Sequence, residues 1–450
     1  MAGKNEIIDL DITAVSTDGS GIGKTAEGLA VFVPAATLGD RLSVKIIKLT
    51  KSYAVGKILE VIAPGEGRVA PECTDCTRCG GCNFWHIDYE TELRYKQRYV
   101  EDNVRRIGGS SAKTEETAPS PWVKRYRNKV IYPVREGTNG QPVFGFFAAR
   151  SHRVIEVRDC LIEPEIFSRI ASWIIAYMRR NNISAYNEET GKGLVRNIFL
   201  RTNTKGDVML CLVVNGKFPG KNLFSQKAAE TFDEIKTVVL NYNTAKTNVV
   251  LSDRYETVLG KGYLEDELCS LRFRISPASF YQINREQAAR LYEAAARLAD
   301  PRKDDVLLDL YCGTGTIGLS MHNKVKRVIG IEIVPEAVEN ARENAKINGI
   351  ENAEFICGDA GKGAALLRER GVKPDIIIVD PPRKGCDGET LSVIKDLSPR
   401  KIVYISCNSA TLARDIAVLE DFGYSAGTVY PFDMFPRTAH VESVVLLSRE

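Results

Sequence analysis

The stretch Asp309-Leu-Tyr-Cys-Gly-Thr-Gly-Thr316 decides the fold of this 450-residue chain. It closes an apolar run at residues 306–311 that is typical of a buried strand, and its two glycines allow a tight turn into the next segment. Farther along, Glu332 ends a second apolar run, where a carboxylate suits a ribose diol. A glycine turn alone also fits plain sharp turns. Together with Glu332 it predicts a nucleoside-binding site at the carboxyl ends of the strands.

Strand-like and helix-like segments alternate through the last part of the chain. The expected strands are residues 306–311, 327–334, 353–358, 375–379, 401–406 and 442–448. A helix is expected at 335–348, ended by Gly349. This alternation predicts an α/β domain with a parallel-dominated sheet covered on both faces. Asp359 follows the third strand and Asp380 the fourth, and the whole set resembles the Rossmann-like class I methyltransferases that use S-adenosylmethionine.

Two residues at strand ends indicate a chemistry. Asp380-Pro-Pro-Arg383 resembles a motif of enzymes that methylate exocyclic amines, but arginine stands where those enzymes have an aromatic residue. One strand later Cys407 follows the run 401–406, and Glu442 opens the last run. A thiolate that adds to carbon 6 of uracil makes carbon 5 nucleophilic, and a carboxylate can then remove the carbon 5 proton. The pair predicts methyl transfer to a pyrimidine carbon, with His440 as a reserve candidate for the base.

The N-terminal part of the chain reads as short β-strands. Alternating or apolar runs at residues 7–12, 29–33 and 41–48 are separated by glycines. Several strands in so few residues predict a small closed barrel of the OB-like kind. The expected domains are a barrel at 1–66, a central α+β domain at 67–265 that carries a cysteine cluster and binds RNA, and a methyltransferase domain at 266–450.

Residues 93–129 concentrate positive charge, although the net charge of the chain is only +3. Ten Lys or Arg stand here against four acidic residues. The aromatic residues interleaved with them are Tyr95, Tyr99, Trp122 and Tyr126. Such a segment attracts phosphates and offers stacking faces to nucleic acid, unless it is only a solvated basic helix face.

Four of the eleven cysteines, Cys73, Cys76, Cys79 and Cys82, lie close together at a regular spacing. Thiolates on so short a segment can wrap one ion or cluster, and zinc is the ordinary interpretation. The chain start lacks the apolar core of a signal peptide, and no apolar run reaches the roughly 18 residues that span a bilayer. We therefore expect a cytoplasmic monomer that has no membrane partner and no disulfide framework.

Four motifs make the chain similar to the RNA (uracil-C5)-methyltransferase family. They are Asp309-Leu-Tyr-Cys-Gly-Thr-Gly315, Val379-Asp-Pro-Pro-Arg383, Ile405-Ser-Cys-Asn408 and Pro431-Phe-Asp-Met-Phe-Pro-Arg-Thr-Ala-His-Val-Glu442. The resemblance covers essentially the whole chain and is greatest to the 23S ribosomal RNA branch, whose members carry a TRAM barrel and an iron–sulfur cluster. It implies that Cys407 is the nucleophile and Glu442 the proton acceptor. The residues expected at S-adenosyl-L-methionine are Gln282, Tyr311, Thr316, Glu332, Asp359 and Asp380, of which Asp359 rests mainly on its place at a strand end.

The same resemblance implies a [4Fe-4S] cluster in place of zinc. Its ligands would be Cys73, Cys79, Cys82 and Cys160, while Cys76 becomes an extra thiol that could replace Cys160. The expected function is the formation of 5-methyluridine in 23S ribosomal RNA, with the target base flipped out of its stack. A tRNA substrate and a non-catalytic iron–sulfur RNA-binding protein are the alternatives. The barrel weighs against the first, and the presence of both Cys407 and Glu442 against the second.

Overall fold

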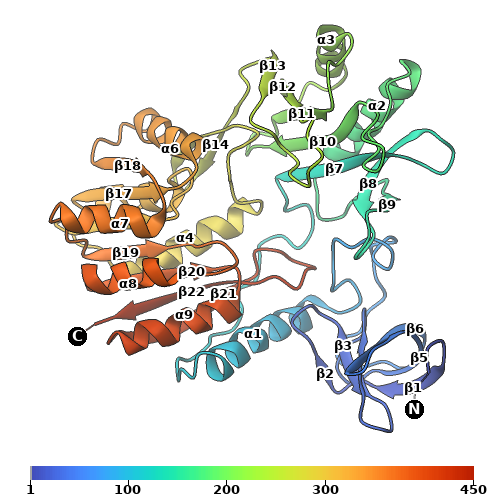
Figure 1. Ribbon diagram of the computed structural model, residues 1–450, viewed down its shortest axis with the longest axis horizontal. Helices are drawn as coiled ribbons and strands as arrows, with labels where there is room; N and C mark the ends of the chain where they lie inside the picture. Colours follow the sequence, from blue (N-terminus) through green and yellow to red (C-terminus); the bar gives the residue numbers. More distant parts are fainter. Residues whose placement is uncertain (1–2, 450) are drawn as a thin grey trace.

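The computed structural model describes residues 3–449, which form three larger sheets and one hairpin (Figure 1). The N-terminal sheet curls around its own core, where Leu10, Val31 and Leu42 are buried. Gly56 lies inside this sheet because a Cβ there would stand 2.2 Å from a methyl carbon of Val44. Its strands, in the spatial order β1-β5-β6-β4-β3-β2, are β1 (Ile7–Asp11), β2 (Ala14–Val15), β3 (Gly21–Lys24), β4 (Ala30–Val33), β5 (Arg41–Leu49) and β6 (Tyr53–Ala63).

The central sheet is mixed, because β11 and β12 run parallel while its other neighbouring strands are antiparallel. Phe167 of α2 and Phe224 of α3 share one core with Ile198 and Leu210 of the sheet. The strands, in the order β13-β12-β11-β10-β7-β8-β9, are β7 (Lys129–Glu136), β8 (Pro142–Phe147), β9 (Val154–Glu156), β10 (Val195–Thr202), β11 (Val208–Val214), β12 (Ile235–Tyr242) and β13 (Tyr255–Leu259). The helices are α2 (Glu165–Arg180) and α3 (Lys221–Thr231).

A hairpin of β14 (Leu264–Leu268) and β15 (Leu271–Ile275) connects the central sheet to the C-terminal one. Leu264 packs with the core of the central sheet, whereas Leu268 packs with the core of the C-terminal sheet. The expected domain boundary at residue 266 therefore falls inside a hairpin that two cores share.

The C-terminal sheet has the order β18-β17-β16-β19-β20-β22-β21, and β22 alone runs against its neighbours. Its strands are β16 (Val306–Leu310), β17 (Arg327–Glu332), β18 (Ala353–Cys357), β19 (Ile376–Val379), β20 (Lys401–Ser406), β21 (Ser425–Phe432) and β22 (Glu442–Ser448). The helical segments are α4 (Arg285–Ala299), α5 (Thr316–Ser320), η1 (His322–Lys324), α6 (Pro335–Ile347), α7 (Ala360–Glu369), α8 (Gly388–Leu397) and α9 (Ser409–Asp421).

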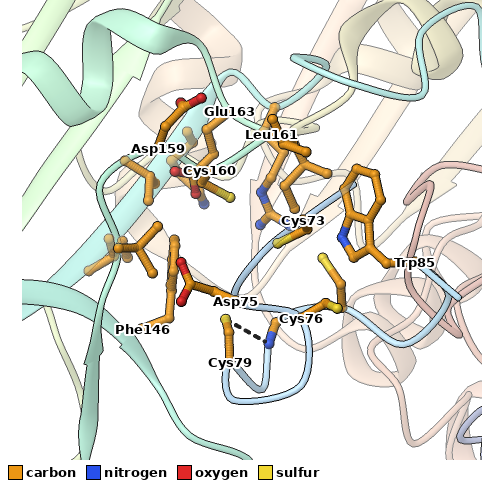
Figure 2. A pocket seen from close by; sticks show the side chains of 18 residues that line it. Cys73, Asp75, Cys76, Cys79, Trp85, Phe146, Asp159, Cys160, Leu161 and Glu163 are labelled. Carbon is orange, nitrogen blue, oxygen red and sulfur yellow. Dashed lines mark hydrogen bonds between the residues drawn. The ribbon is translucent and has the colours of Figure 1, made fainter. Parts of the chain in front are cut away.

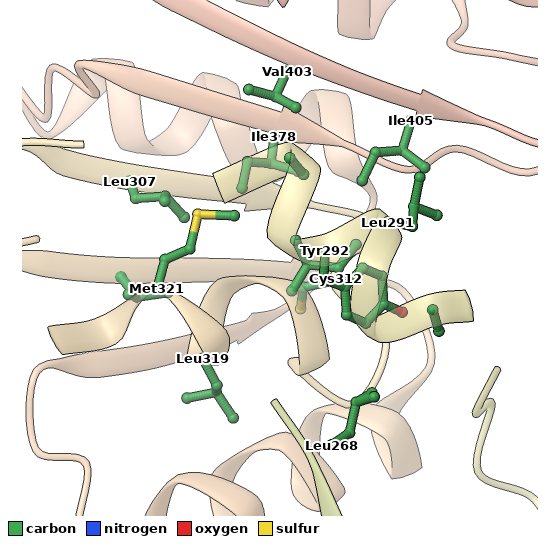
Figure 3. Close-up of a cluster of buried hydrophobic side chains, with 14 of the residues drawn as sticks. Leu268, Leu291, Tyr292, Leu307, Cys312, Leu319, Met321, Ile378, Val403 and Ile405 are labelled. Carbon is green, nitrogen blue, oxygen red and sulfur yellow. The ribbon is translucent and has the colours of Figure 1, made fainter. Parts of the chain in front are cut away.

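Both faces of the C-terminal sheet are covered, as the apolar runs predict. Alternate residues of one strand enter different cores, since Leu307 belongs to the layer with α4 and Leu308 to the opposite layer. Figure 3 shows the first layer, in which Leu291 of α4 lies near Ile405 and on the same side of the sheet as Leu307 and Ile378. The described residues contain no helix that is long and apolar enough to cross a membrane.

Helix α1 (Tyr89–Arg106) begins at Asp88, whose carboxylate accepts a hydrogen bond from the amide of Thr91 at 2.7 Å. It lies between the N-terminal sheet and the C-terminal sheet (Figure 1), and its residues Val100 and Val104 enter the C-terminal core. The helix is therefore part of the packing between domains and not a free basic surface.

This packing corrects the expectation of aromatic stacking faces along residues 93–129. Tyr95, Tyr99 and Tyr126 are only 2%, 7% and 4% exposed, because each faces a core. Trp122 is the exception, with 61% of its surface exposed.

A buried group of charges fixes α1 to the loop before β22. The ammonium of Lys96 lies 2.7 Å from a carboxylate oxygen of Glu92 and 2.6 Å from one of Asp433, and all three side chains are fully buried. The amide of Arg437 donates to the same oxygen of Glu92 at 2.7 Å. Burial by itself lowers the pKa of Lys96, but the two carboxylates outweigh this effect and raise it. The group is stable only as a whole, because each buried charge depends on its partners.

Replacing Lys96 by methionine should lower the free energy of unfolding by about 3–5 kcal/mol, because the buried Asp433 would lose its cation and Glu92 would keep only the more distant guanidinium of Arg437. Urea denaturation followed by far-ultraviolet circular dichroism measures this loss. The matched control is Arg105→Ala, which removes an exposed ion pair with Asp102 and should change stability by less than about 1 kcal/mol. Equal stabilities of the two variants would contradict the role given to Lys96.

Candidate active site

A cavity of about 570 Å³ opens at the carboxyl ends of the parallel strands. This is the edge of an open α/β sheet where ligands bind. All eight residues that the sequence predicted for catalysis and cofactor binding line it. They are Gln282, Tyr311, Thr316, Glu332, Asp359, Asp380, Cys407 and Glu442.

The turn after β16 is shaped by backbone conformation. Tyr311, Gly313 and Gly315 all have positive φ, at 64°, 55° and 81°, which is uncommon for a residue with a side chain such as tyrosine. Glu332 holds this turn, since one carboxylate oxygen accepts from the amide of Gly313 at 3.0 Å and the other from the amide of Val334 at 2.9 Å. Each oxygen keeps a further lone pair, so the carboxylate can still accept from a ribose hydroxyl.

Asp309 supports the same turn from beneath, a role that the sequence analysis did not foresee. Its side chain is 1% exposed and accepts a hydrogen bond from the amide of Gly318 at 2.9 Å. Burial raises the pKa of Asp309 to about 7. A carboxylate in the middle of an otherwise apolar strand was the signal in the sequence.

The remaining cofactor candidates form the walls of the cavity. The hydroxyl groups of Tyr311 and Thr390 lie 3.3 Å apart, and those of Tyr292 and Thr316 lie 3.4 Å apart. Asp359 is the N-cap of α7, so it stands where the positive end of the helix dipole meets the cavity. The walls therefore combine hydroxyl, carboxylate and aromatic groups around one space, a set that suits a nucleoside with a charged tail.

Cys407 and Glu442 meet because β22 runs antiparallel to β20. In the register of these strands Ser406 faces Ser443. The residue after the end of β20 is therefore placed beside the first residue of β22, and both line the cavity. Two residues that are far apart in the sequence thus reach the same edge of the sheet.

The electrostatic surroundings of this pair suppress charge. Burial, followed by the carboxylates of Glu442 and Asp380, raises the pKa of the Cys407 thiol to about 11. Burial and Asp380 likewise raise the pKa of Glu442. Arg383 acts in the opposite direction on both groups. Its guanidinium is the cation that favours a thiolate and a carboxylate here.

Arg383 is held close to the pair by its own backbone. Its carbonyl oxygen accepts from the side-chain amide of Asn408 at 2.9 Å and from the hydroxyl of Thr411 at 3.3 Å. Its guanidinium donates to Nε2 of His440 at 3.3 Å. Partial burial and Arg383 both lower the pKa of His440, so its imidazole is a neutral hydrogen-bond partner at the cavity rim.

Five cysteines border a second cavity of about 320 Å³. Cys73, Cys76, Cys79 and Cys82 come from the loop before α1, and Cys160 comes from the loop before α2. In Figure 2 the labelled cysteines lie around a common space. Within residues 3–449, no three Cys, His, Asp or Glu side chains form a group that could hold a metal ion. The iron–sulfur cluster expected in the central domain therefore stays a prediction.

The thiols that border this cavity have the chemistry that a metal–sulfur group needs. Burial raises the pKa of all five, to about 12 for Cys82. Buried thiols of this kind are neutral alone and become thiolates when a bound metal compensates the charge.

Sheet order, glycine turn and strand-end carboxylates together define a class I S-adenosylmethionine-dependent methyltransferase. The tRNA (uracil-5-)-methyltransferase family matches residues 165–450, and the TRAM domain matches residues 4–59. The chain therefore belongs to this family of RNA uracil-5-methyltransferases and carries an N-terminal TRAM domain.

Relatives support the same assignment over the full length. A Clostridium tetani protein named as an uncharacterized RNA methyltransferase is 41% identical and covers 99% of this chain and 97% of its own. A Halalkalibacterium halodurans protein of the same description is 40% identical, with the same coverage. The structure of Pyrococcus abyssi tRNA (uracil-54, C5)-methyltransferase in complex with S-adenosyl-L-homocysteine has a TM-score of 0.77 and 25% identity, and covers 98% of this chain and all of its own.

Proposed function

We propose that this enzyme converts a uridine of 23S ribosomal RNA to 5-methyluridine, with Cys407 as nucleophile and Glu442 as base. The observation that carries the proposal is the antiparallel register of β20 and β22, which sets thiol and carboxyl side by side at the cavity. A target base must be flipped out to reach them.

The chemistry balances with these two groups. The Cys407 thiolate bonds to carbon 6 of uracil, and the electrons of the 5,6 double bond move toward the carbonyl at carbon 4 as an enolate. Carbon 5 would then bond to the methyl carbon of bound S-adenosylmethionine as the methyl–sulfur bond breaks, and S-adenosylhomocysteine would leave with the electron pair of that bond. Glu442 then accepts the proton of carbon 5, the 5,6 double bond re-forms, and the sulfur of Cys407 leaves carbon 6.

The raised pKa of Glu442 suits its role as the base, whereas the raised pKa of Cys407 means that its thiol must lose a proton before it attacks. A base works best when its pKa lies near the working pH, and burial moves the pKa of Glu442 upward in that direction. Arg383 favours the charged forms of both residues, and we assign it the role of sustaining the thiolate. Gln282, Tyr311, Thr316, Glu332, Asp359 and Asp380 are proposed to hold the cofactor.

Two observations bear on the class of RNA. The motifs resemble the ribosomal RNA branch, which supports 23S RNA as the substrate. The Pyrococcus abyssi enzyme that acts on tRNA aligns with 98% of this chain, so the alignment extends over the barrel. The barrel therefore does not by itself exclude tRNA, and tRNA remains the second candidate.

We also propose that the cysteine cavity holds a [4Fe-4S] cluster, with zinc as the alternative. Cys73, Cys79, Cys82 and Cys160 would hold the cluster, which would fix the surrounding loops and leave the methyl transfer to other residues. The thiols of Cys79 and Cys82 raise the pKa of Cys160, which supports their closeness, whereas Cys73 is the one thiol among the main influences on Cys76.

Cys407→Ala should reduce methylation by at least about 1,000-fold while cofactor affinity stays within about twofold, because the variant loses only the nucleophile. Transfer of labelled methyl to RNA and calorimetric titration with S-adenosylmethionine measure the two quantities. The control is Cys357→Ala, which changes an exposed cysteine and should leave both unchanged. Substantial turnover by Cys407→Ala would remove the covalent mechanism.

Glu442→Gln should let the first two steps proceed and block the third, so that RNA stays bonded to Cys407 after methylation. The expected product is a protein–RNA band that survives denaturing electrophoresis. The double variant Cys407→Ala with Glu442→Gln is the control and should show no such band. Free methylated RNA at the wild-type rate from Glu442→Gln would assign the proton to another base, with His440 the next to test.

The class of RNA is tested by incubating the enzyme with unmodified 23S ribosomal RNA and unmodified tRNA in parallel. We expect 5-methyluridine in the ribosomal RNA, located by nuclease digestion and mass spectrometry. Methylation of tRNA alone would reverse the choice of substrate and leave the mechanism intact.

Anaerobically purified protein should be brown and contain about four irons and four sulfides per chain. Cys160→Ser should lose this absorbance, while Cys76→Ser should keep it. Colourless protein with one zinc per chain would establish the alternative metal. If Cys76→Ser lost the cluster and Cys160→Ser kept it, Cys76 would be the fourth ligand in place of Cys160.

A further inference from the structure

A third cavity, of about 280 Å³, lies behind the wall of the active-site cavity. Its size is close to the lower end of the range of about 300–1,000 Å³ found for small-molecule sites. Four of its lining side chains are Lys or Arg and only Glu286 is acidic. Trp122 stands at this cavity with 61% of its surface exposed. The space therefore combines an aromatic face with excess positive charge, the pairing that binds single-stranded nucleic acid.

Trp122 differs from the two other tryptophans. Trp85 is 4% exposed, and Trp173 stacks on Tyr177 and contacts Phe224 within the central core. Neither of these two tryptophans has a free ring face on which a ligand could stack. The described contacts of Trp122 give its ring no aromatic or cationic neighbour.

The backbone that carries Trp122 is anchored. The carbonyl oxygen of Trp122 accepts from the hydroxyl of Ser120 at 2.8 Å. That hydroxyl in turn accepts from the side-chain amide of Asn284 at 3.0 Å, and the amide of Ser120 donates to the hydroxyl of Tyr89 at 2.8 Å. The anchored backbone limits where the exposed ring can lie, so little backbone entropy is lost when a base binds.

The cavity of Trp122 and the active-site cavity share a wall. Asn128 contributes to the former and bonds through its side-chain and backbone N–H groups to the carbonyl oxygens of Gln282 and Ile283, each at 2.8 Å. Gln282 and Ile283 line the active-site cavity, while Arg285 lines the cavity of Trp122. The active-site cavity and the cavity of Trp122 are therefore neighbours across this wall.

Most of the basic side chains at the cavity of Trp122 already have acidic partners. Lys124 is paired with Glu72, Arg125 with Asp159, and Arg285 with Asp266. Arg127 makes no side-chain hydrogen bond or ion pair with the residues that the structure describes, and its own backbone is fixed to Ile162. The half-buried Arg127 is therefore the one basic residue of this cavity that has no ion-pair partner among the described residues, and it also lines the cysteine cavity.

We propose that Trp122 stacks on a nucleobase that flanks the target uridine, while Arg127 contacts the adjoining phosphate. This inference rests on the proposed RNA methylation. It adds a second position at which the enzyme binds its RNA substrate. Stacking of this kind tolerates any base, because every base has a flat face. The subsite therefore adds affinity for an unpaired RNA segment and little preference for its sequence.

The test uses the full-length protein with Trp122→Ala and with Trp122→Phe, which keeps a flat ring. In the transcript that the wild-type enzyme methylates, Trp122→Ala should raise the KM for RNA by about 10-fold, within the range that loss of one stacked base gives. The loss should fall in KM and not in kcat, and Trp122→Phe should recover most of it. Leu223→Ala is the control, since Leu223 is an exposed apolar residue on α3.

A fluorescence titration distinguishes stacking from a purely structural role of Trp122. A short single-stranded oligouridylate should quench wild-type tryptophan emission, and Trp122→Phe should abolish most of the quenching while still binding the RNA. Unchanged KM in Trp122→Ala, or unchanged quenching in Trp122→Phe, would overturn the subsite. Wild-type protein that binds RNA without methylating it would defeat the proposed function and leave the fluorescence test valid.

Discussion

The buried charges of Lys96, Glu92 and Asp433 are the constraint on which the assembly of this enzyme depends. They join α1 to the loop 433–441, and that loop is also hydrogen-bonded to other segments of the chain. The side chains or amides that bond to it come from three further segments. They are Asn83, next to the cysteine segment, Tyr126, before the central sheet, and Asn284, at the start of α4. Because such a group is costly unless complete, all of these segments are held in one arrangement.

This arrangement connects the cysteine cavity to the reacting edge of the sheet. Asn83 follows Cys82 in the chain, and its amide donates to the carbonyl oxygen of Arg437 at 2.8 Å. The same loop carries Phe435 and His440, which line the active-site cavity, and it ends where Glu442 begins β22. Whatever fixes the cysteine segment therefore also fixes the rim over which a flipped uridine would enter. The proposed metal–sulfur group would therefore have a structural role at a distance from the chemistry.

The active site holds several buried carboxyl groups in surroundings that favour their neutral forms. Asp309, Asp380 and Glu442 all have raised pKa values because burial disfavours their ionised forms. The cofactor class brings a positive charge to this edge of the sheet, and carboxylates with raised pKa values respond strongly to such a charge. Arg383 opposes this effect, because its positive charge lowers the pKa values of Cys407 and Glu442. A carboxyl that is readily charged and discharged is what the removal of a carbon-bound proton requires.

The sequence alone determined the C-terminal sheet and the cavity residues, because apolar runs, glycine turns and strand-end carboxylates are local patterns. It did not indicate β21, where Gly427 and Pro431 interrupt the apolar alternation and pairing with β22 supplies the missing stability. It also misplaced Tyr95 and Tyr99, since a basic helix gives no local sign of which face a partner will cover. Only the tertiary structure decided that Lys96 is enclosed by acids and that Trp122 stays open to solvent. These outcomes depend on contacts between segments far apart in the chain, which no local pattern encodes.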